Sequence, residues 1–108
     1  MQERRNFDRI EIPASAGVYV ATSQGKRVGD VVMLGRGGFM LATGTNFPRG
    51  QKSDFLLVDD ASGIRASVRA TARYSSNEGI GFEFEELGAE TAETVGVIIG
   101  KYDRKPNG

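Results

Sequence analysis

Residues 64–74 alternate between apolar or small side chains and polar or charged ones. This pattern is typical of a half-buried β-strand, because successive side chains of a strand point to opposite faces of the sheet. One face carries Ile64, Ala66, Val68, Ala70, Ala72 and Tyr74. The other carries Arg65, Ser67, Arg69, Thr71 and Arg73. We expect the first face to join a hydrophobic core and the second to meet solvent.

Most of the remaining chain is divided into short alternating runs by fifteen glycines and three prolines. These runs predict five further strands, at residues 17–23, 27–34, 38–43, 53–58 and 79–85. The connections are short and rich in turn-forming residues, which predicts antiparallel neighbours. Six such strands bury their apolar faces and lose their free edges when they close into a barrel. The predicted fold class is therefore mainly all-β, a six-stranded antiparallel β-barrel.

A different periodicity begins after residue 88. Apolar residues recur at helical spacing at Ala92, Val95, Ile98 or Ile99, and Tyr102. Glu90 and Glu93 come early, where the helix dipole favours negative charge. The pattern predicts one C-terminal α-helix that closes the domain. Its β-branched residues and Gly96 leave a seventh strand as the alternative.

The chain of 108 residues suits one domain. We expect an arginine-rich N-terminal arm at residues 1–9, the barrel with its helix at residues 10–103, and a flexible tail at residues 104–108. The sequence has no cysteine and no histidine, so it offers no disulfide, no thiolate zinc site and none of the commonest general bases. It shows neither a signal peptide nor an apolar run of membrane-spanning length, and we expect a cytoplasmic protein.

The stretch RRNFDR places Arg4, Arg5 and Arg9 within six residues of a chain whose formal net charge is zero. A guanidinium group presents its donors in a fixed fork that suits phosphate oxygens and the edge of guanine. Phe7 lies between Arg5 and Arg9, where an apolar ring would anchor the arm to the barrel. Two interpretations follow: a solvated charged terminus, or an anion clamp that closes over a ligand.

Three stretches in this order resemble the PilZ domain family, bacterial receptors for the second messenger cyclic di-GMP. ERRNFDR contains the family's RxxxR signature at Arg5 and Arg9, and MLGRGGFML lies where the family has its D/N-x-S-x-x-G motif. GIGFEFEELG resembles the family's last strand leading into its helix. The resemblance covers roughly residues 3 to 102 and implies a non-enzymatic barrel that holds its ligand on the outer surface.

The resemblance also assigns roles to residues of the arm. It implies that Arg5 and Arg9 contact phosphate and guanine edges, with Arg4 as a helper. The arm is expected to be mobile when free and to order over cyclic di-GMP, which presents a new surface to a downstream protein partner in trans. Control of motility, pili or exopolysaccharide is the role that the resemblance implies.

The second motif is degenerate in this chain. Met33 stands where the family has Asp or Asn, and Gly35 stands where it has Ser, whereas Gly38 keeps the family's glycine. Methionine offers only a weak thioether acceptor, and glycine offers only its backbone. The loss of two neutral hydrogen bonds would weaken binding by roughly fivefold to more than a hundredfold.

The glycines of this motif suggest how such a loss is compensated. The N–H groups of Gly35, Gly37 and Gly38, together with Arg36, would form a substitute anion nest, and a tight hairpin turn is the alternative. The predicted ligand-binding residues are Arg4, Arg5, Arg9, Gly35, Arg36, Gly37 and Gly38. We predict no catalytic residue, no metal site and no cofactor other than the ligand.

The sequence leaves three other functions open. A PilZ-like domain that has lost its ligand would act as a protein-binding adaptor. Nucleic-acid binding is suggested by Arg65, Arg69 and Arg73 along one strand, but most aromatic residues occupy positions that a core would claim, and the net charge is zero. These aromatic residues include Phe39, Phe55, Tyr74, Phe82 and Phe84. An enzyme is the least supported class, because neither Asp59 and Asp60 nor the glutamates at 83, 85 and 86 gain a third convergent group.

Overall fold

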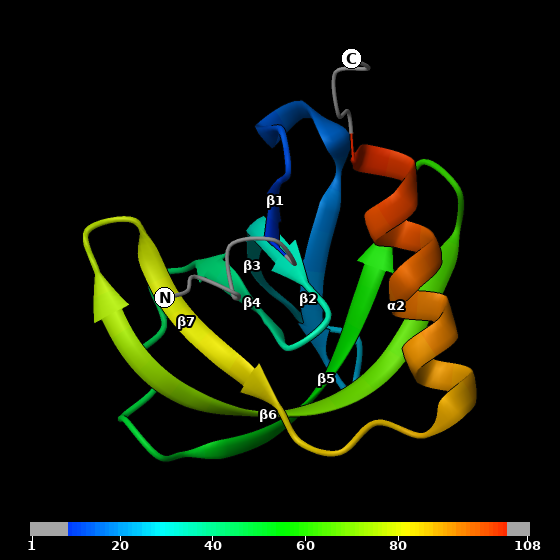
Figure 1. Ribbon diagram of the computed structural model, residues 1–108. Helices are drawn as coiled ribbons and strands as arrows, with labels where there is room; N and C mark the ends of the chain where they lie inside the picture. Colours follow the sequence, from blue (N-terminus) through cyan, green and yellow to red (C-terminus); the bar gives the residue numbers. More distant parts are fainter. Residues whose placement is uncertain (1–8, 104–108) are drawn as a thin grey trace, which may run out of the picture.

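The computed structural model describes residues 9–103 of the chain (Figure 1). Its strands are β1 (Arg9–Glu11), β2 (Val18–Thr22), β3 (Arg27–Gly35), β4 (Gly38–Ala42), β5 (Lys52–Asp59), β6 (Ile64–Ser76) and β7 (Gly79–Phe84). The 3₁₀ helix η1 (Ala14–Ala16) and the α-helix α2 (Ala89–Tyr102) complete the described part. No helix within it is long and apolar enough to cross a membrane.

Six of these strands close into a barrel. The hydrogen-bonded order is β3, β2, β5, β6, β7 and β4, and β4 pairs back onto β3. Every pairing is antiparallel. The predicted closed six-stranded antiparallel barrel with one C-terminal helix is therefore confirmed. The observed strand ends lie within two residues of the predicted ones.

The short strand β1 is an addition that the sequence pattern does not predict, because three residues are too few to show an alternation. It pairs with the end of β3, so that Arg9 lies opposite Gly35 and Glu11 lies opposite Met33. Nearer the start of β3, the same edge pairs with β2, and the other edge of β3 pairs with β4. This pairing fixes Arg9 against the barrel wall.

The barrel interior is filled by aromatic rings. Phe39 and Phe82 stack with ring centroids 5.1 Å apart, and Phe55 meets Phe82 edge-on at 5.2 Å. All three rings are buried, as the strand alternation predicts. Phe84 is only half-buried and packs against this cluster.

The helix α2 lies beside the long curved strand β6 (Figure 1) and buries Val95, Ile98 and Ile99 in the same core. These three residues recur on one helical face, and their burial outweighs the weak helix propensity of β-branched residues. The alternative of a seventh strand at this place is therefore wrong. Ala92, expected on the buried face, is exposed because it lies one turn before the region that packs on the barrel.

The alternation along β6 holds from Ala66 to Ala70 and then fails at two residues. Thr71 is buried and donates a hydrogen bond to the carboxylate of Glu85. Tyr74, predicted for the core, is 44% exposed. The pairing of β6 with β7 shifts register between Ala72 and Tyr74, so that Arg73 is an extra residue of a β-bulge. The bulge turns Tyr74 to the outer face.

Candidate functional site

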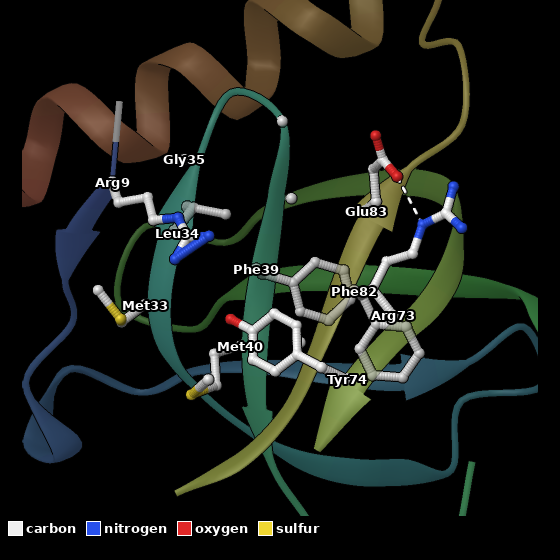
Figure 2. Close-up of a pocket in the computed structure, with 13 residues that line it drawn as sticks. Arg9, Met33, Leu34, Gly35, Phe39, Met40, Arg73, Tyr74, Phe82 and Glu83 are labelled. Atoms are coloured by element: carbon white, nitrogen blue, oxygen red, sulfur yellow. Dashed lines mark hydrogen bonds and ion pairs between the residues drawn. The ribbon is translucent and has the colours of Figure 1, made fainter. Parts of the chain in front are cut away.

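A hollow opens on the outer wall of the barrel, where β1, β3, β4, β7 and β6 lie side by side (Figure 2). Its side chains come from two rows of directly opposed residues, which share a face of the sheet. One row consists of Arg9, Gly35, Gly38 and Glu83. The neighbouring row consists of Met33, Met40, Gly81 and Tyr74. The hollow is thus charged at both ends of one row and apolar along the other.

The two glycines of the first row leave part of the wall without side chains. Gly35 and Gly38 carry no side chain, so the wall between Arg9 and Glu83 is bare backbone, and the cavity measures about 320 Å³. Gly38 also has a packing role: a Cβ built there would lie 2.0 Å from the carbonyl oxygen of Phe82. Glycine is therefore needed for the close approach of β4 to β7.

Arg9 borders the hollow on the side of β1. Its exposed side chain extends from β1 toward β3 (Figure 2). Among residues 9–103 no carboxylate lies within ion-pair distance of its guanidinium group. With no such partner in this range, its guanidinium donors are available to an anion as far as the described residues are concerned.

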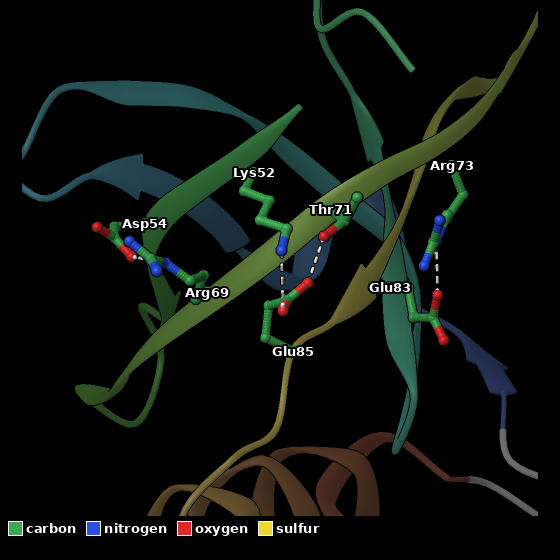
Figure 3. Close-up of polar contacts among 7 residues, drawn as sticks. All are labelled: Lys52, Asp54, Arg69, Thr71, Arg73, Glu83 and Glu85. Atoms are coloured by element: carbon green, nitrogen blue, oxygen red, sulfur yellow. Dashed lines mark hydrogen bonds and ion pairs between the residues drawn. The ribbon is translucent and has the colours of Figure 1, made fainter. Parts of the chain in front are cut away.

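The opposite side of the hollow carries an ion pair. Arg73 Nε lies 2.6 Å from Glu83 Oε1, and both side chains are exposed (Figure 3). Because Glu83 neutralises Arg73 locally, the positive potential of the hollow is concentrated at Arg9.

The arginine stripe on β6 does not present three unpaired charges. Arg69 Nε lies 3.0 Å from Asp54 Oδ1, in addition to the pair between Arg73 and Glu83 (Figure 3). Arg65 has no such partner in the described part of the chain. This interleaving of charges gives no support to a phosphate-binding track along β6.

The turn between β3 and β4 is a tight hairpin in which Arg36 and Gly37 connect Gly35 to Gly38. None of the residues at 35–38 has a positive φ. The backbone therefore has the geometry of a tight turn without left-handed residues, and the substitute anion nest at this turn stays a prediction.

The predicted ligand-binding residues are distributed unevenly around this site. Arg9, Gly35, Gly37 and Gly38 all line the hollow. Arg36 does not line it; its Nη1 lies 3.8 Å from the position of a Cβ on Gly96, beside α2. Arg4, Arg5 and the expected ordering of the arm fall outside the described residues.

Sequence reasoning did not assign several of the residues that line the hollow to the site. They are Met40, Arg73, Tyr74, Gly81 and Glu83. They are brought together by strand register, which cannot be seen in the sequence before the partners of each strand are known. Alternation assigned Tyr74 to the core because the bulge at Arg73 has no sequence signature.

Asp59, the first residue of the acidic pair at the end of β5, has a structural role. Asp59 is fully buried and accepts hydrogen bonds from Ser62 Oγ at 2.7 Å, Lys101 Nζ at 2.8 Å and the Tyr102 hydroxyl at 2.7 Å. Burial alone would raise the pKa of Asp59, but these hydrogen bonds outweigh it and hold the pKa below its ordinary value. The carboxylate joins the end of α2 to the hairpin between β5 and β6.

No group of three or more residues with metal-binding side chains occurs within residues 9–103.

Comparison with protein families matches residues 3–100 to the model described as PilZ domain. Comparison with curated proteins finds no match.

Proposed function

The chain belongs to the PilZ domain family, and from this premise we propose that it is a cyclic di-GMP receptor whose ligand lies in the hollow between β1 and the hairpin of β3 and β4. The family consists of ligand-binding and adaptor domains.

The pairing of β1 with β3 is the observation that carries the proposal. It sets Arg9, the second arginine of RxxxR, directly opposite Gly35 of the second motif, although the two are far apart in sequence. Gly38 then follows across the hairpin. Arg9 and the second motif thus border one cavity, and the guanidinium of Arg9, which pairs with no carboxylate among residues 9–103, suits a phosphate of the cyclic dinucleotide.

Arg4 and Arg5 are proposed to complete the clamp. In this proposal the segment before Arg9 folds over the bound messenger and adds guanidinium groups to a site that lacks the polar side chains of the family motif at 33 and 35. The folded segment presents a changed surface to a downstream protein partner.

Calorimetric titration with cyclic di-GMP tests this function. The wild type is expected to bind saturably, and Arg9→Ala is expected to weaken binding at least about tenfold, because it removes charge-assisted hydrogen bonds. Arg65→Ala is the matched control, since Arg65 is exposed, lies away from the hollow and carries the same charge. GTP should not substitute for cyclic di-GMP.

A protein-interaction adaptor is the second candidate, and the presence of Met33 and Gly35 in the degenerate motif favours it. No heat from the wild type at high micromolar cyclic di-GMP would support the adaptor and contradict the receptor. Equal losses in Arg9→Ala and Arg65→Ala would also contradict the proposed site, because they would show a nonspecific effect of charge.

A further inference from the structure

Tyr74 is an aromatic residue held out of the core by the fold. The bulge at Arg73 places it opposite Gly81 of β7, on the outer wall. Within residues 9–103 it is one of two large hydrophobic residues that remain exposed, the other being Val97 on α2. Of these two, only Tyr74 lines the hollow.

The missing side chain at Gly81 is what lets the ring lie against the wall. A Cβ on Gly81 would come within 2.3 Å of Tyr74 Cζ and 2.4 Å of its Cε2, so the ring occupies the space that a side chain there would fill. The closest approach is to the far end of a side chain, not to backbone. The position of the Tyr74 ring therefore depends on glycine at 81.

The row is continued by two methionines. Met40 lies directly opposite Gly81, and Met33 lies directly opposite Met40. Figure 2 shows the ring of Tyr74 extending from β6 toward Met40. Thioether sulfur is polarizable and makes favourable contacts with aromatic rings. Together Met33, Met40 and Tyr74 form an apolar strip beside the row that carries Arg9.

We propose that this apolar strip, with Tyr74 as its aromatic member, binds the face of a purine base of the ligand while Arg9 holds a phosphate. This inference rests on the proposed function and names the surface that recognises the base. A flat heterocycle suits the exposed ring of Tyr74, which lies in one row with the half-buried Met33 and the buried Met40, because stacking needs a π-face and no hydrogen-bonding edge.

Recognition by the face of a base has a consequence for specificity. An Asp or Asn at position 33 would bond to the edge of guanine, but Met33 has no donor and only a weak acceptor. Stacking tolerates any purine, because every base presents a π-face. The chain therefore discriminates weakly between guanine and adenine. The affinity for cyclic di-AMP is within about tenfold of the affinity for cyclic di-GMP, because the two binding free energies differ by roughly one neutral hydrogen bond.

The test is calorimetric titration of the full chain with cyclic di-GMP and cyclic di-AMP. Tyr74→Ala is expected to weaken both ligands by roughly 5- to 150-fold, the range for loss of one base stack. Tyr74→Phe keeps the ring and should bind within about twofold of the wild type. Gly81→Ala displaces the ring without removing it and should lose affinity for both ligands.

Tyr19→Ala is the matched control, because Tyr19 lies on β2 outside the hollow, where its ring contacts Arg27. Thermal denaturation verifies that each variant is folded. If the wild type binds and Tyr74→Ala binds equally well, the apolar strip is refuted and the receptor function stands. If the affinity of the wild type for cyclic di-AMP is lower than its affinity for cyclic di-GMP by a factor above about ten, the tolerance for adenine is refuted. If the wild type binds neither ligand, the proposed function and the strip both fail.

Discussion

Asp59→Ala is expected to lower the free energy of unfolding by roughly 3 kcal/mol, which corresponds to a fall of about 10–25 °C in the melting temperature of a domain of this size. The carboxylate is fully buried and receives three side-chain hydrogen bonds, two of them from the last turn of α2. Its removal leaves the Tyr102 hydroxyl without this partner and detaches the end of the helix from the β5–β6 hairpin.

Asp60→Ala is the control for this variant. The two residues are neighbours in sequence, but the side chain of Asp60 is exposed and takes part in no hydrogen bond or ion pair with the described residues. Its replacement should change the melting temperature little. Equal destabilisation by the two variants would show that the buried network does not hold the helix in place.

The same network predicts how stability depends on pH. The pKa of Asp59 is lower in the folded state than in the unfolded state. Its contribution to the free energy of unfolding is therefore present above the unfolded pKa of about 4, and it is lost as the pH falls through the lower pKa of the folded state. The pKa of Lys101 is raised, mainly by its hydrogen bond to Asp59, so its contribution is lost as the pH rises through the folded value. Urea unfolding should be measured at a series of pH values. The free energy of unfolding should fall less at acid pH in Asp59→Asn than in the wild type.

Gly38→Ala is expected to destabilise the protein by at least about 3 kcal/mol, because the new Cβ would lie 2.0 Å from a backbone oxygen of β7 that cannot move without opening the barrel. Gly37→Ala, one residue away in the same turn, is the matched control. Its Cβ would meet nothing within 4 Å, and its φ is not positive. Chemical denaturation should therefore place Gly37→Ala within about 0.5 kcal/mol of the wild type.

The fold was predictable because its signals are local. The alternation in β6 and the glycines between runs define the strands, and the spacing of Val95, Ile98 and Ile99 defines the helix. The three-residue strand β1 was not predictable, since its formation depends on an edge of β3 that β2 leaves open. The exposure of Tyr74 was not predictable either, because a bulge is decided by the pairing of two strands.

The site was predictable only where a sequence motif marks it. Arg9, Gly35 and Gly38 were named from the two motifs and lie together at the hollow, although their ligand-binding role stays a prediction. The apolar strip of Met33, Met40 and Tyr74 comes from three different strands, which no motif joins. Arg36 shows the limit of motif reasoning: it lies within the second motif, yet its side chain is turned toward α2. Side-chain direction in a turn depends on the tertiary neighbours.

Backbone amide chemical shifts during titration with cyclic di-GMP test the central claim most directly. If the messenger binds in the hollow, the largest shifts should fall at Arg9, Gly35, Gly38, Tyr74 and Gly81, which line it from β1, β3, β4, β6 and β7. Gly25 and Val97, which do not line the hollow, should stay unchanged. Shifts centred elsewhere on the barrel, or none at saturating ligand, would contradict the account.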